Sequence, residues 1–537
     1  MCKKLVAFLL CAMMLVSLVA CGGGGNDTPA TSTPGQSTTT PGTSTPGTST
    51  PGTSTPGTSA PSTAVEFKED VIIGTNQEFT TTDPQGSNSM APLTLATLTH
   101  ETLTSVDGVG NVSPGLATYE QVDALTYVFT IPDNVTFTNG DPCTTEDIAF
   151  TFERARESSF TSGKITTLDH TEIISPTQIK FVLNSPNQDF LTTLAHRGLG
   201  IMSKKACEAD PAKGFEIGTG RYYLTQWVPG DVTALARYDG YRGEKGVAKT
   251  ITFRHIAETS ARIIALQNDE IDLALNLDSL DASTILADSS LELAKVQDVQ
   301  CKYLAFNVNA APFTDPKVRQ AIAHAVNKDN VILGATNGEG LVHTSVVNKT
   351  QFGLDETLQD YAYDPALAKS MLAEAGYPNG IELTLTCYKG APYETIAAVV
   401  QNDMAAAGIT VKVNPVEPAA QKAMMKEGQH EMVVYAWTDA IGTDFTVRSL
   451  LYSTSGSNRC KIADPALDKM IDDALGETDI AKREQMYKDI QQYVHGLCPY
   501  IMLYTSYMYS AISAGTAGIV WNANGVHDFS LVSVPVA

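Results

Sequence analysis

The sequence predicts a mixed α/β protein, because segments with strand and helix periodicity alternate along most of the chain. Residues 381–385 and 409–413 alternate apolar and polar side chains as strands do, and residues 395–407 between them read as a helix that stops at Gly408. A strand, a helix and a second strand in this order form a β-α-β unit with parallel strands. A short apolar strand at 432–435 follows the next predicted helix.

The first half of the folded region shows the same mixture. The apolar run 71–73 reads as a strand that ends at Gly74, and residues 127–131 and 179–183 read as two further strands. Between these two, Thr144 precedes Asp147 by three residues, as in the capping box that starts a helix. The side chains that share the buried face of this helix are Ile148, Phe152 and Ala155.

The second half carries stronger helix signals and the first candidate site. Asp364 and Pro365 read as an N-cap and first-turn proline, and Gly376 stands where that helix should end. A further helix passes through Ala423 and Met424, and the chain then reaches Trp437-Thr438-Asp439 directly after the 432–435 strand. Ligands of doubly wound sheets bind beyond the carboxyl ends of strands, so this tripeptide is a candidate ligand-binding segment.

The N-terminus has the features of an export signal. Lys3 and Lys4 precede an apolar run over residues 5–20, which is shorter than the roughly 20 apolar residues that span a bilayer. Leu18-Val19-Ala20-Cys21 resembles the lipobox of bacterial lipoproteins, whose cysteine is lipidated before the signal peptide, here 1–20, is removed. We therefore expect Cys21 to be the lipidation site; an ordinary secretory signal is the alternative. Both place the protein outside the cytoplasm.

Residues 21–64 are expected to hold the lipidated cysteine and a disordered tether. The segment is almost wholly Gly, Ser, Thr and Pro and repeats the pentad P-G-T-S-T. It has no apolar face to bury and its prolines oppose helix formation. As a flexible coil it would hold its ends about 35 Å apart.

Composition suits a globular body after residue 64 and argues against some partners. The whole chain is 43% hydrophobic and 18% charged, which is typical of a soluble domain with a large core. Lys+Arg 36 against Asp+Glu 59 gives a net charge of −23. An excess of acid opposes binding of nucleic acid through basic patches, so no nucleic-acid partner is expected.

Neither metal binding nor catalysis has support in the motifs. Six cysteines of the body are widely spaced without a C-x-x-C pair, which leaves disulfides and buried free thiols both open. The chain contains no H-E-x-x-H, G-x-S-x-G or P-loop pattern, and its histidines are scattered. We expect no enzyme activity, no catalytic residues, no metal and no cofactor. The six cysteines are Cys143, Cys207, Cys301, Cys387, Cys460 and Cys498.

The stretch 101–156 resembles the signature region of the family 5 bacterial extracellular solute-binding proteins, the dipeptide-, oligopeptide- and nickel-binding lipoproteins of ABC importers. Further segments beginning at Gly218, Ser260, Tyr303 and Cys498 are similar to that family in the same order. The chain departs from the family pattern at Arg221, where a small residue is usual, and at Asp439, which lies two residues after Trp437 rather than three. The matched positions are Leu116, Leu125, Phe137, Gly140, Pro142, Glu146 and Asp147.

The resemblance implies a two-lobed periplasmic-binding-protein-like fold, cluster C and type II, with an extra subdomain in lobe I. The implied boundaries are residues 65–302 for lobe I, 303–502 for lobe II and 503–537 for a C-terminal return to lobe I. The extra subdomain would occupy about 103–213. The chain would cross between lobes near 301–303 and 499–503, and the lobes would close around the ligand by hinge motion.

The resemblance also implies a substrate-binding set. Lobe II would contribute Trp437, Thr438 and Asp439, and lobe I would contribute Glu78 and Phe79, with Asn307 near a crossing. Each has a plainer interpretation as well. Trp437 and Phe79 could be core residues, and Asp439 could stabilise its own turn. Glu78 could be a solvated loop residue, and Asn307 could brace the hinge.

The leading function is therefore a lipid-anchored binding protein that captures di- or oligopeptides and delivers them to the permease of an ABC importer. The same fold binding a metal chelate, an oligosaccharide or another small solute is the alternative. A tethered surface hydrolase or adhesin is a third reading. The expected partners are the solute and the membrane permease. The protein is expected to be an extracytoplasmic monomer, lipid-anchored to the cell membrane on the cell surface or the periplasmic face.

Overall fold

The computed structural model describes residues 65–107, 111–349, 351–438 and 442–536. Residues 64–537 form one compact unit, and Cys21, the tether and Asp439 lie outside the described residues. A mixed sheet of eleven strands runs through this unit, and two smaller sheets of four and two strands accompany it. This agrees with the predicted α/β class.

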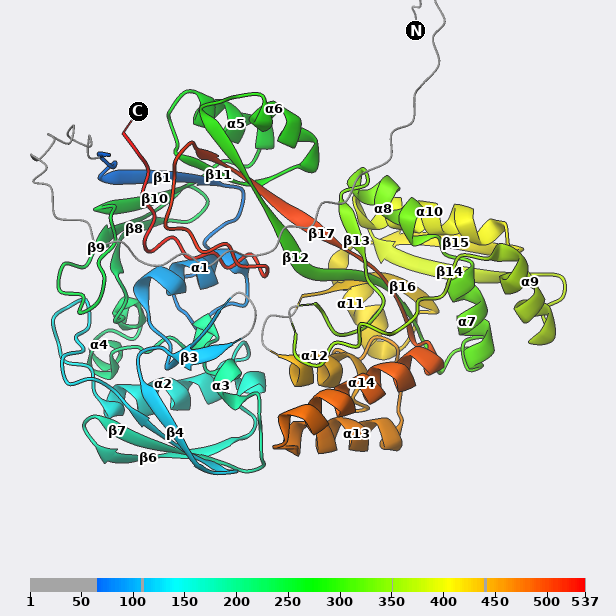
Figure 1. Cartoon of the computed structure of the whole chain (residues 1–537), viewed down its shortest axis with the longest axis horizontal. Helices are drawn as coiled ribbons and strands as arrows, with labels where there is room; N and C mark the ends of the chain where they lie inside the picture. Colours follow the sequence, from blue (N-terminus) through cyan, green and yellow to red (C-terminus); the bar gives the residue numbers. More distant parts are fainter. Residues whose placement is uncertain (1–64, 108–110, 350, 439–441, 537) are drawn as a thin grey trace, which may run out of the picture. The chain divides into compact units, whose positions relative to one another are not determined.

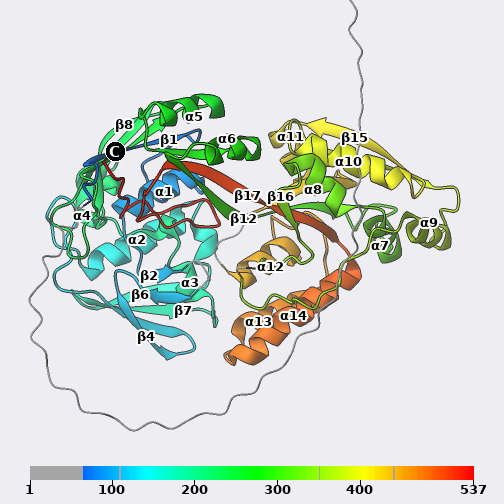
Figure 2. The same cartoon turned by 45° about the horizontal axis from the view of Figure 1, so that its top comes forward.

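Two long antiparallel strands join the two lobes of the fold. Strand β12 (Leu291–Phe306) pairs with β17 (Tyr500–Ser513) along nearly its whole length. The pairing is interrupted between Gln297 and Cys301. Figures 1 and 2 show β12 and β17 running side by side from the strands around β1 (Asp70–Thr75) to β16 (Met432–Trp437) and β14 (Ile381–Tyr388).

We call lobe I the part of the fold on one side of this strand crossing, where strands from the first half of the chain pack with the C-terminal segment. Parallel pairs join β1 to β10 and to β11, whereas β9 pairs with β10 and β8 in antiparallel fashion. The C-terminal residues Phe529, Val532 and Val534 are buried against this part of the sheet. The strands are β1 (Asp70–Thr75), β8 (Tyr222–Val228), β9 (Val232–Arg237), β10 (Thr250–His255) and β11 (Leu273–Leu277). The helices are α1 (Met90–Thr99), α4 (Lys204–Ala209), α5 (Thr259–Gln267) and α6 (Ala282–Leu286), with 3-10 turns η3 (Gly214–Glu216) and η4 (Ser279–Asp281).

A subdomain with its own aromatic core is inserted in lobe I. Its sheet has the order β4-β5-β7-β6, and Phe129, Phe152 and Phe181 meet edge to face beneath it. The predicted capping box is confirmed, since Thr144 and Asp147 cap α2 reciprocally. The elements are β2 (Thr104–Val106), β3 (Val112–Pro114), β4 (Thr118–Asp123), β5 (Thr126–Thr130), β6 (Leu168–Ser175), β7 (Gln178–Leu183), α2 (Thr145–Glu157), α3 (Phe190–Thr193), η1 (Ser162–Lys164) and η2 (Arg197–Leu199).

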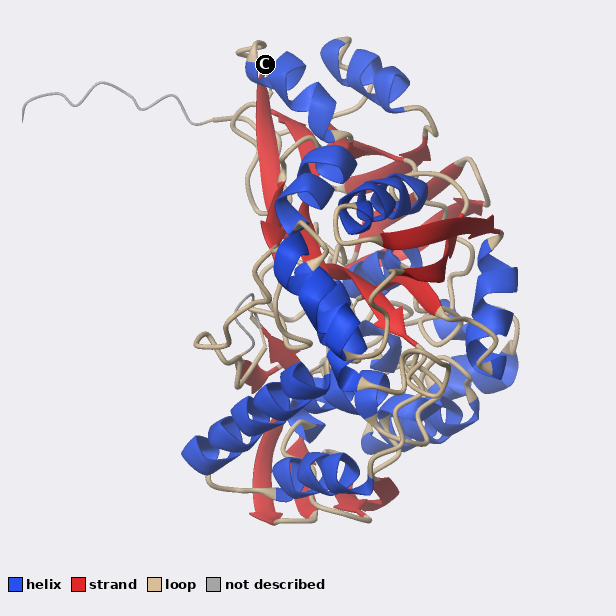
Figure 3. Ribbon diagram, turned by 90° about the vertical axis from the view of Figure 1, so that its right-hand side faces the viewer, coloured by secondary structure: helices blue, strands red, loops and turns tan. Residues whose placement is uncertain are grey.

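Lobe II contains the predicted β-α-β unit. Strand β14 (Ile381–Tyr388) pairs in parallel with β15 (Ile409–Val416) and with β16 (Met432–Trp437), so the predicted strands are confirmed. Helix α10 (Tyr393–Ala405) begins two residues before the predicted start. Helices pack on both faces of these strands, α10 beside Leu385 and Val434 and α14 (Ile480–Leu497) beside Val433. Figure 3 views the molecule from this side, with helices in front of strands. The remaining elements are β13 (Gly340–Val342), α7 (Pro316–His324), α8 (Lys328–Thr336), α9 (Pro365–Glu374), α11 (Pro418–Glu427), α12 (Thr443–Leu451), α13 (Pro465–Gly476) and α14 (Ile480–Leu497).

Three helices of lobe II begin with the same N-terminal motif, an aspartate N-cap followed by a proline. Asp315, Asp364 and Asp464 are N-caps whose carboxylates accept backbone N–H groups, and each is followed by a proline in the first turn. The carboxylate satisfies donors that the helix leaves unpaired, and proline fits where no donor is needed. Gly376 adopts a φ of +99° just past α9, as its predicted position at the helix end requires.

Candidate ligand-binding site

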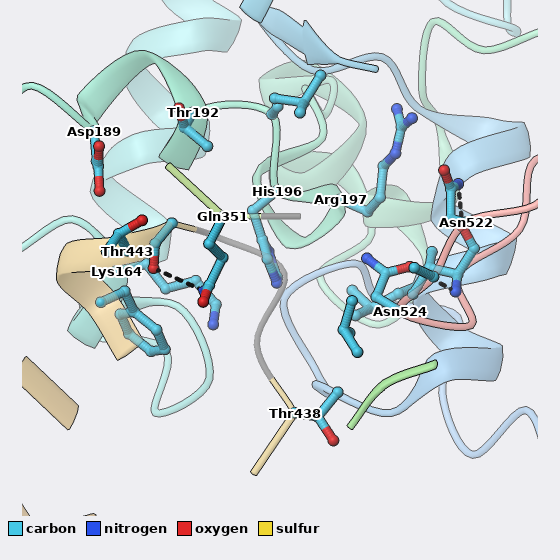
Figure 4. Close-up of a pocket in the computed structure, with 18 of the residues that line it drawn as sticks. Lys164, Asp189, Thr192, His196, Arg197, Gln351, Thr438, Thr443, Asn522 and Asn524 are labelled. Atoms are coloured by element: carbon cyan, nitrogen blue, oxygen red, sulfur yellow. Dashed lines mark hydrogen bonds between the residues drawn. The ribbon is translucent and has the colours of Figure 1, made fainter. Parts of the chain in front are cut away.

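A cavity of about 460 Å³ is lined by residues of both lobes. This volume falls within the range of roughly 300 to 1,000 Å³ of small-molecule sites. Lobe II contributes an aromatic wall, lobe I contributes most of the charged side chains, and the C-terminal segment closes one side through Asn522 to Val526. Figure 4 shows these side chains converging from separate segments of the chain.

The aromatic wall consists of Phe352, Trp437 and Phe445. Trp437 ends β16, and its ring stacks on Phe445 with a centroid distance of 6.1 Å and an interplanar angle of 30°. Trp437 is partly buried and also packs against the lobe II core. The tryptophan therefore combines the two roles that the sequence left open, since one part contacts the core and another lines the cavity.

Thr438 is held by the strand that joins the lobes. Its hydroxyl accepts a hydrogen bond of 2.8 Å from Nε2 of Gln300, and Gln300 in turn accepts a hydrogen bond from the ammonium of Lys302. Both partners belong to β12 close to the interruption of its pairing with β17. The hydroxyl of Thr438 is thus hydrogen-bonded to the part of β12 where its pairing with β17 is interrupted.

On the lobe I side, Asp189 is a partly buried carboxylate that already has partners in lobe II. Its Oδ2 accepts a hydrogen bond of 3.3 Å from the backbone N–H of Asp444, and its Oδ1 lies 3.6 Å from the guanidinium of Arg483. Burial raises the pKa of Asp189, and the positive charge of Arg483 opposes that rise. Asp189 therefore ties the subdomain to α12 and α14 across the cavity.

The basic side chains of the cavity come from two 3-10 turns of the subdomain. Lys164 ends η1, and its ammonium lies 5.5 Å from the centroid of the Phe445 ring, at the distance of a cation–π contact. His196 is the N-cap of η2, and Arg197 is the first residue of that turn. Burial lowers the pKa of the Arg197 guanidinium, with the nearby Arg221 acting in the same direction and Asp528 opposing it.

Of the six substrate-binding residues predicted, the structure brings Trp437 and Thr438 to this cavity, and Asp439 adjoins them outside the described residues. Phe79 is buried in the lobe I core, with its ring centroid 4.9 Å from that of Phe253, and Glu78 is exposed beside it. Asn307 is buried and donates hydrogen bonds to the carbonyls of Gly428 and His430. Glu78, Phe79 and Asn307 do not line this cavity.

Arg221 is engaged away from the cavity. Its Nε donates to the carbonyl of Glu244, one of its terminal nitrogens donates to Ser530, and its guanidinium lies 5.0 Å from the centroid of the Tyr241 ring. It braces the start of β8 against the C-terminal segment.

Four residues that line the cavity were not among the predicted site residues, namely Lys164, Asp189, His196 and Arg197. The first stands in a three-residue turn and the other three in loop and short helix, with no periodic pattern or motif around them. Only their place in three dimensions marks them, since the subdomain presents these loops toward lobe II.

Among the described residues, neither the cysteines nor any group of potential metal ligands forms a second site. All six cysteines of the described chain are free thiols, and five of them are buried. Burial raises the pKa of Cys387 and Cys460 to about 11, which keeps both thiols protonated. No group of three or more His, Cys, Asp or Glu side chains within the described ranges could hold a metal ion. Among those same residues, none of the helices combines the length and the apolarity that crossing a membrane requires.

A mixed α/β sheet shared by two lobes, with a ligand-sized cavity lined from both, is the architecture of the periplasmic binding proteins. The chain belongs to the bacterial extracellular solute-binding proteins, family 5, since the sequence profile of that family's middle region matches residues 111–459. Proteins of this family bind solutes and are not enzymes, so this chain is a solute-binding protein.

Two curated relatives and two solved structures illustrate the likeness. The chain is 28% identical over 465 residues to the dipeptide-binding protein of Escherichia coli K12, covering 80% of this chain and 87% of that protein. It is 26% identical over 471 residues to the glutathione-binding protein GsiB of Salmonella paratyphi A, covering 84% and 91%.

The fold matches HbpA2 from Haemophilus parasuis with a TM-score of 0.79 at 23% identity, covering 87% of this chain and 100% of that one. It matches DppA from Helicobacter pylori in complex with the peptide STSA with a TM-score of 0.74 at 23% identity, covering 88% and 99%. These two likenesses establish the fold.

Proposed function

We propose that this chain is the substrate-binding component of an ABC importer and that it captures small peptides. The observation that carries the proposal is the cavity shared by the two lobes, which combines an aromatic wall with both acidic and basic side chains. A peptide has complementary groups, namely a cationic and an anionic end, amides and apolar side chains. The names of the relatives, a dipeptide-binding and a glutathione-binding protein, support this ligand class.

Capture would proceed by closure of the lobes about β12 and β17. We assign residues 65–302 and 503–537 to lobe I and 303–502 to lobe II, with the hinge at the interrupted pairing between Gln297 and Cys301. Trp437, Thr438 and Asp439 would contact the ligand from lobe II. Contacts from Glu78, Phe79 or Asn307 would need a rearrangement of the packing described above.

The location we propose follows from the N-terminal sequence. Cys21 would carry the lipid anchor, the Gly/Ser/Thr/Pro segment would let the body reach its permease, and the protein would work as a monomer on the outer face of the cell membrane. Two acyl chains on one cysteine suffice for stable anchoring on the usual affinity scale.

Native mass spectrometry of freshly purified protein tests the ligand class, followed by thermal shift with defined ligands. The panel would contain Met-Leu, Ser-Thr-Ser-Ala, glutathione, an oligosaccharide and a nickel chelate. A ligand present at 100 times its dissociation constant stabilises the folded state by about 2.7 kcal/mol, a readily measured rise in melting temperature. Stabilisation by a peptide supports the proposal. Stabilisation by only the sugar or the chelate, or a co-purified non-peptide solute, would replace it with the alternative ligand class.

A further inference from the structure

His196 is fixed in one tautomer by its own turn. The backbone N–H of Gly198 donates to Nδ1 of His196 at 3.0 Å, which makes the histidine ring the N-cap of η2. A nitrogen that accepts a hydrogen bond carries a lone pair, so the proton of the neutral ring must be on Nε2. Within the described part of the chain, Nε2 has no hydrogen-bond partner. The ring therefore offers one N–H donor at its free end.

The surroundings keep this ring uncharged. Burial lowers the pKa of His196 well below its ordinary value, and the positive charges of Lys164 and Arg197 lower it further. Protonation would also place a hydrogen on Nδ1 facing the N–H of Gly198, which breaks the cap. Among the described residues, the carboxylates that line the same cavity are Asp107, which accepts hydrogen bonds from Asn111, and Asp189, which is engaged by Arg483 and the Asp444 N–H.

His196 and Lys164 are directed toward the same part of the cavity. Figure 4 shows the His196 ring pointing from its loop toward the region of Lys164 and Gln351, whereas the Arg197 side chain leaves the loop in another direction. Lys164 approaches from η1 and lies over Phe445, whereas His196 belongs to η2, so two separate turns converge on one position. A neutral N–H donor beside an ammonium is complementary to an anionic acceptor.

We propose that His196 and Lys164 form a carboxylate subsite on the lobe I wall, which orients the ligand opposite Trp437. This inference rests on the proposed peptide-binding function and specifies which groups hold one end of the ligand. The carboxylate can come from the C-terminus of the peptide or from an acidic side chain. Binding data on matched peptides distinguish these two sources.

Two substitutions at His196 separate ligand binding from the capping role. In His196→Asn the short amide oxygen can still accept the Gly198 N–H, but the donor at the Nε2 position is lost. In His196→Gln the longer amide can place an N–H near the Nε2 position, but the acceptor at Nδ1 is lost. If His196 binds the ligand, His196→Asn should bind more weakly and His196→Gln should retain binding. If His196 only caps η2, His196→Gln should have a reduced melting temperature and both variants should bind the ligand as wild type does.

The measurement is isothermal titration calorimetry with Met-Leu, Met-Leu amide, Met-Glu amide and Met-Gln amide, on wild type, the two His196 variants and Lys164→Met. In one of the two pairs, Met-Leu with Met-Leu amide or Met-Glu amide with Met-Gln amide, we expect wild type to bind the peptide with the carboxylate at least tenfold more tightly than the peptide without it. Preference for Met-Leu over its amide assigns the C-terminus, and preference for Met-Glu amide over Met-Gln amide assigns a side chain. His196→Asn and Lys164→Met should lose most of that preference and His196→Gln should keep it.

The outcomes that contradict the inference are distinct from those that contradict the function. Peptides that bind wild type with equal affinity for acid and amide forms, or a His196→Asn variant with an unchanged preference, would overturn the carboxylate subsite and leave peptide binding intact. Failure of every peptide in the panel, including Ser-Thr-Ser-Ala and glutathione, to bind would overturn the proposed function and the subsite together.

Discussion

Trp437→Ala removes the indole of the cavity's aromatic wall and should weaken peptide binding about thirtyfold. A peptide that covers on the order of 40 Å² of the ring buries apolar area worth about 1 kcal/mol. Stacking geometry adds about 1 kcal/mol when an aromatic or amide face lies against the ring. Together these effects correspond to about 2 kcal/mol, or roughly a thirtyfold rise in Kd.

The loss of folding stability should be smaller than for a core tryptophan. Trp437 is only partly buried, and part of its surface lines the cavity, so alanine leaves much of the new space open to solvent. Truncation of a fully buried tryptophan costs about 3 to 5 kcal/mol, and we expect about half of that or less here. Urea denaturation measures this loss, and calorimetric titration with Met-Leu measures Kd.

Trp227→Ala is the matched control. Trp227 is also partly buried, packs against the lobe I core and donates from Nε1 to the carbonyl of Phe79 at 2.8 Å, but it does not line the cavity. Its loss should reduce stability and leave Kd unchanged. If Trp437→Ala unfolds the protein, or if it leaves Kd unchanged while Trp227→Ala raises it, the assignment of Trp437 to the ligand is refuted.

Three further predictions follow from the fold and the N-terminus. Cys21→Ala should abolish acylation and release the protein from membranes, and continued partitioning of the variant into the detergent phase would contradict the anchor. Ligand should reduce the radius of gyration in small-angle scattering because the lobes close about β12 and β17; binding without that change would exclude hinge closure. Burial lowers the pKa of His100, His343 and His527 to about 4 in the folded protein. In the unfolded chain these histidines have a pKa of about 6.5, so between about pH 6.5 and pH 4 the unfolded chain binds protons that the folded protein does not bind. Stability should therefore fall from pH 7 to pH 5 by about 2 kcal/mol for each of these histidines, measured by denaturation, and a flat or rising profile would show that they are charged in the folded state.

Local signals predicted the elements well because each depends on neighbours in sequence. The Thr144–Asp147 capping box, the Asp364–Pro365 start of α9 and the apolar alternation of β14 and β15 are all present in the structure. The position of Trp437 at the end of β16 was also predictable, since the rule for strand ends needs only the order of elements.

The lobe I side of the cavity was not predictable from local pattern. Lys164 and His196 belong to 3-10 turns separated by two strands and a short helix, and neither turn has a periodic face. They meet only because β6 and β7 pair and return the chain to the same end of the subdomain. By contrast, Phe79 has the local sequence of a loop next to a strand but is buried against Phe253, in a core cluster that also contains Phe529 of the C-terminal segment.

The state of Asp189 also restricts how a peptide lies in the cavity. Asp189 is shared between Arg483 and the Asp444 N–H, so the guanidinium already balances its negative charge and a ligand ammonium there would compete with contacts that join the lobes. Competition with this partly buried ion pair favours an ammonium partner on the Trp437–Thr438 side, where Asp439 follows in sequence. With the carboxylate at His196 and Lys164, the peptide would then run from lobe II at its amino end to lobe I at its carboxyl end. Each terminus would be held by a different lobe, and a ligand bound in this way stabilises the closed arrangement in preference to the open one.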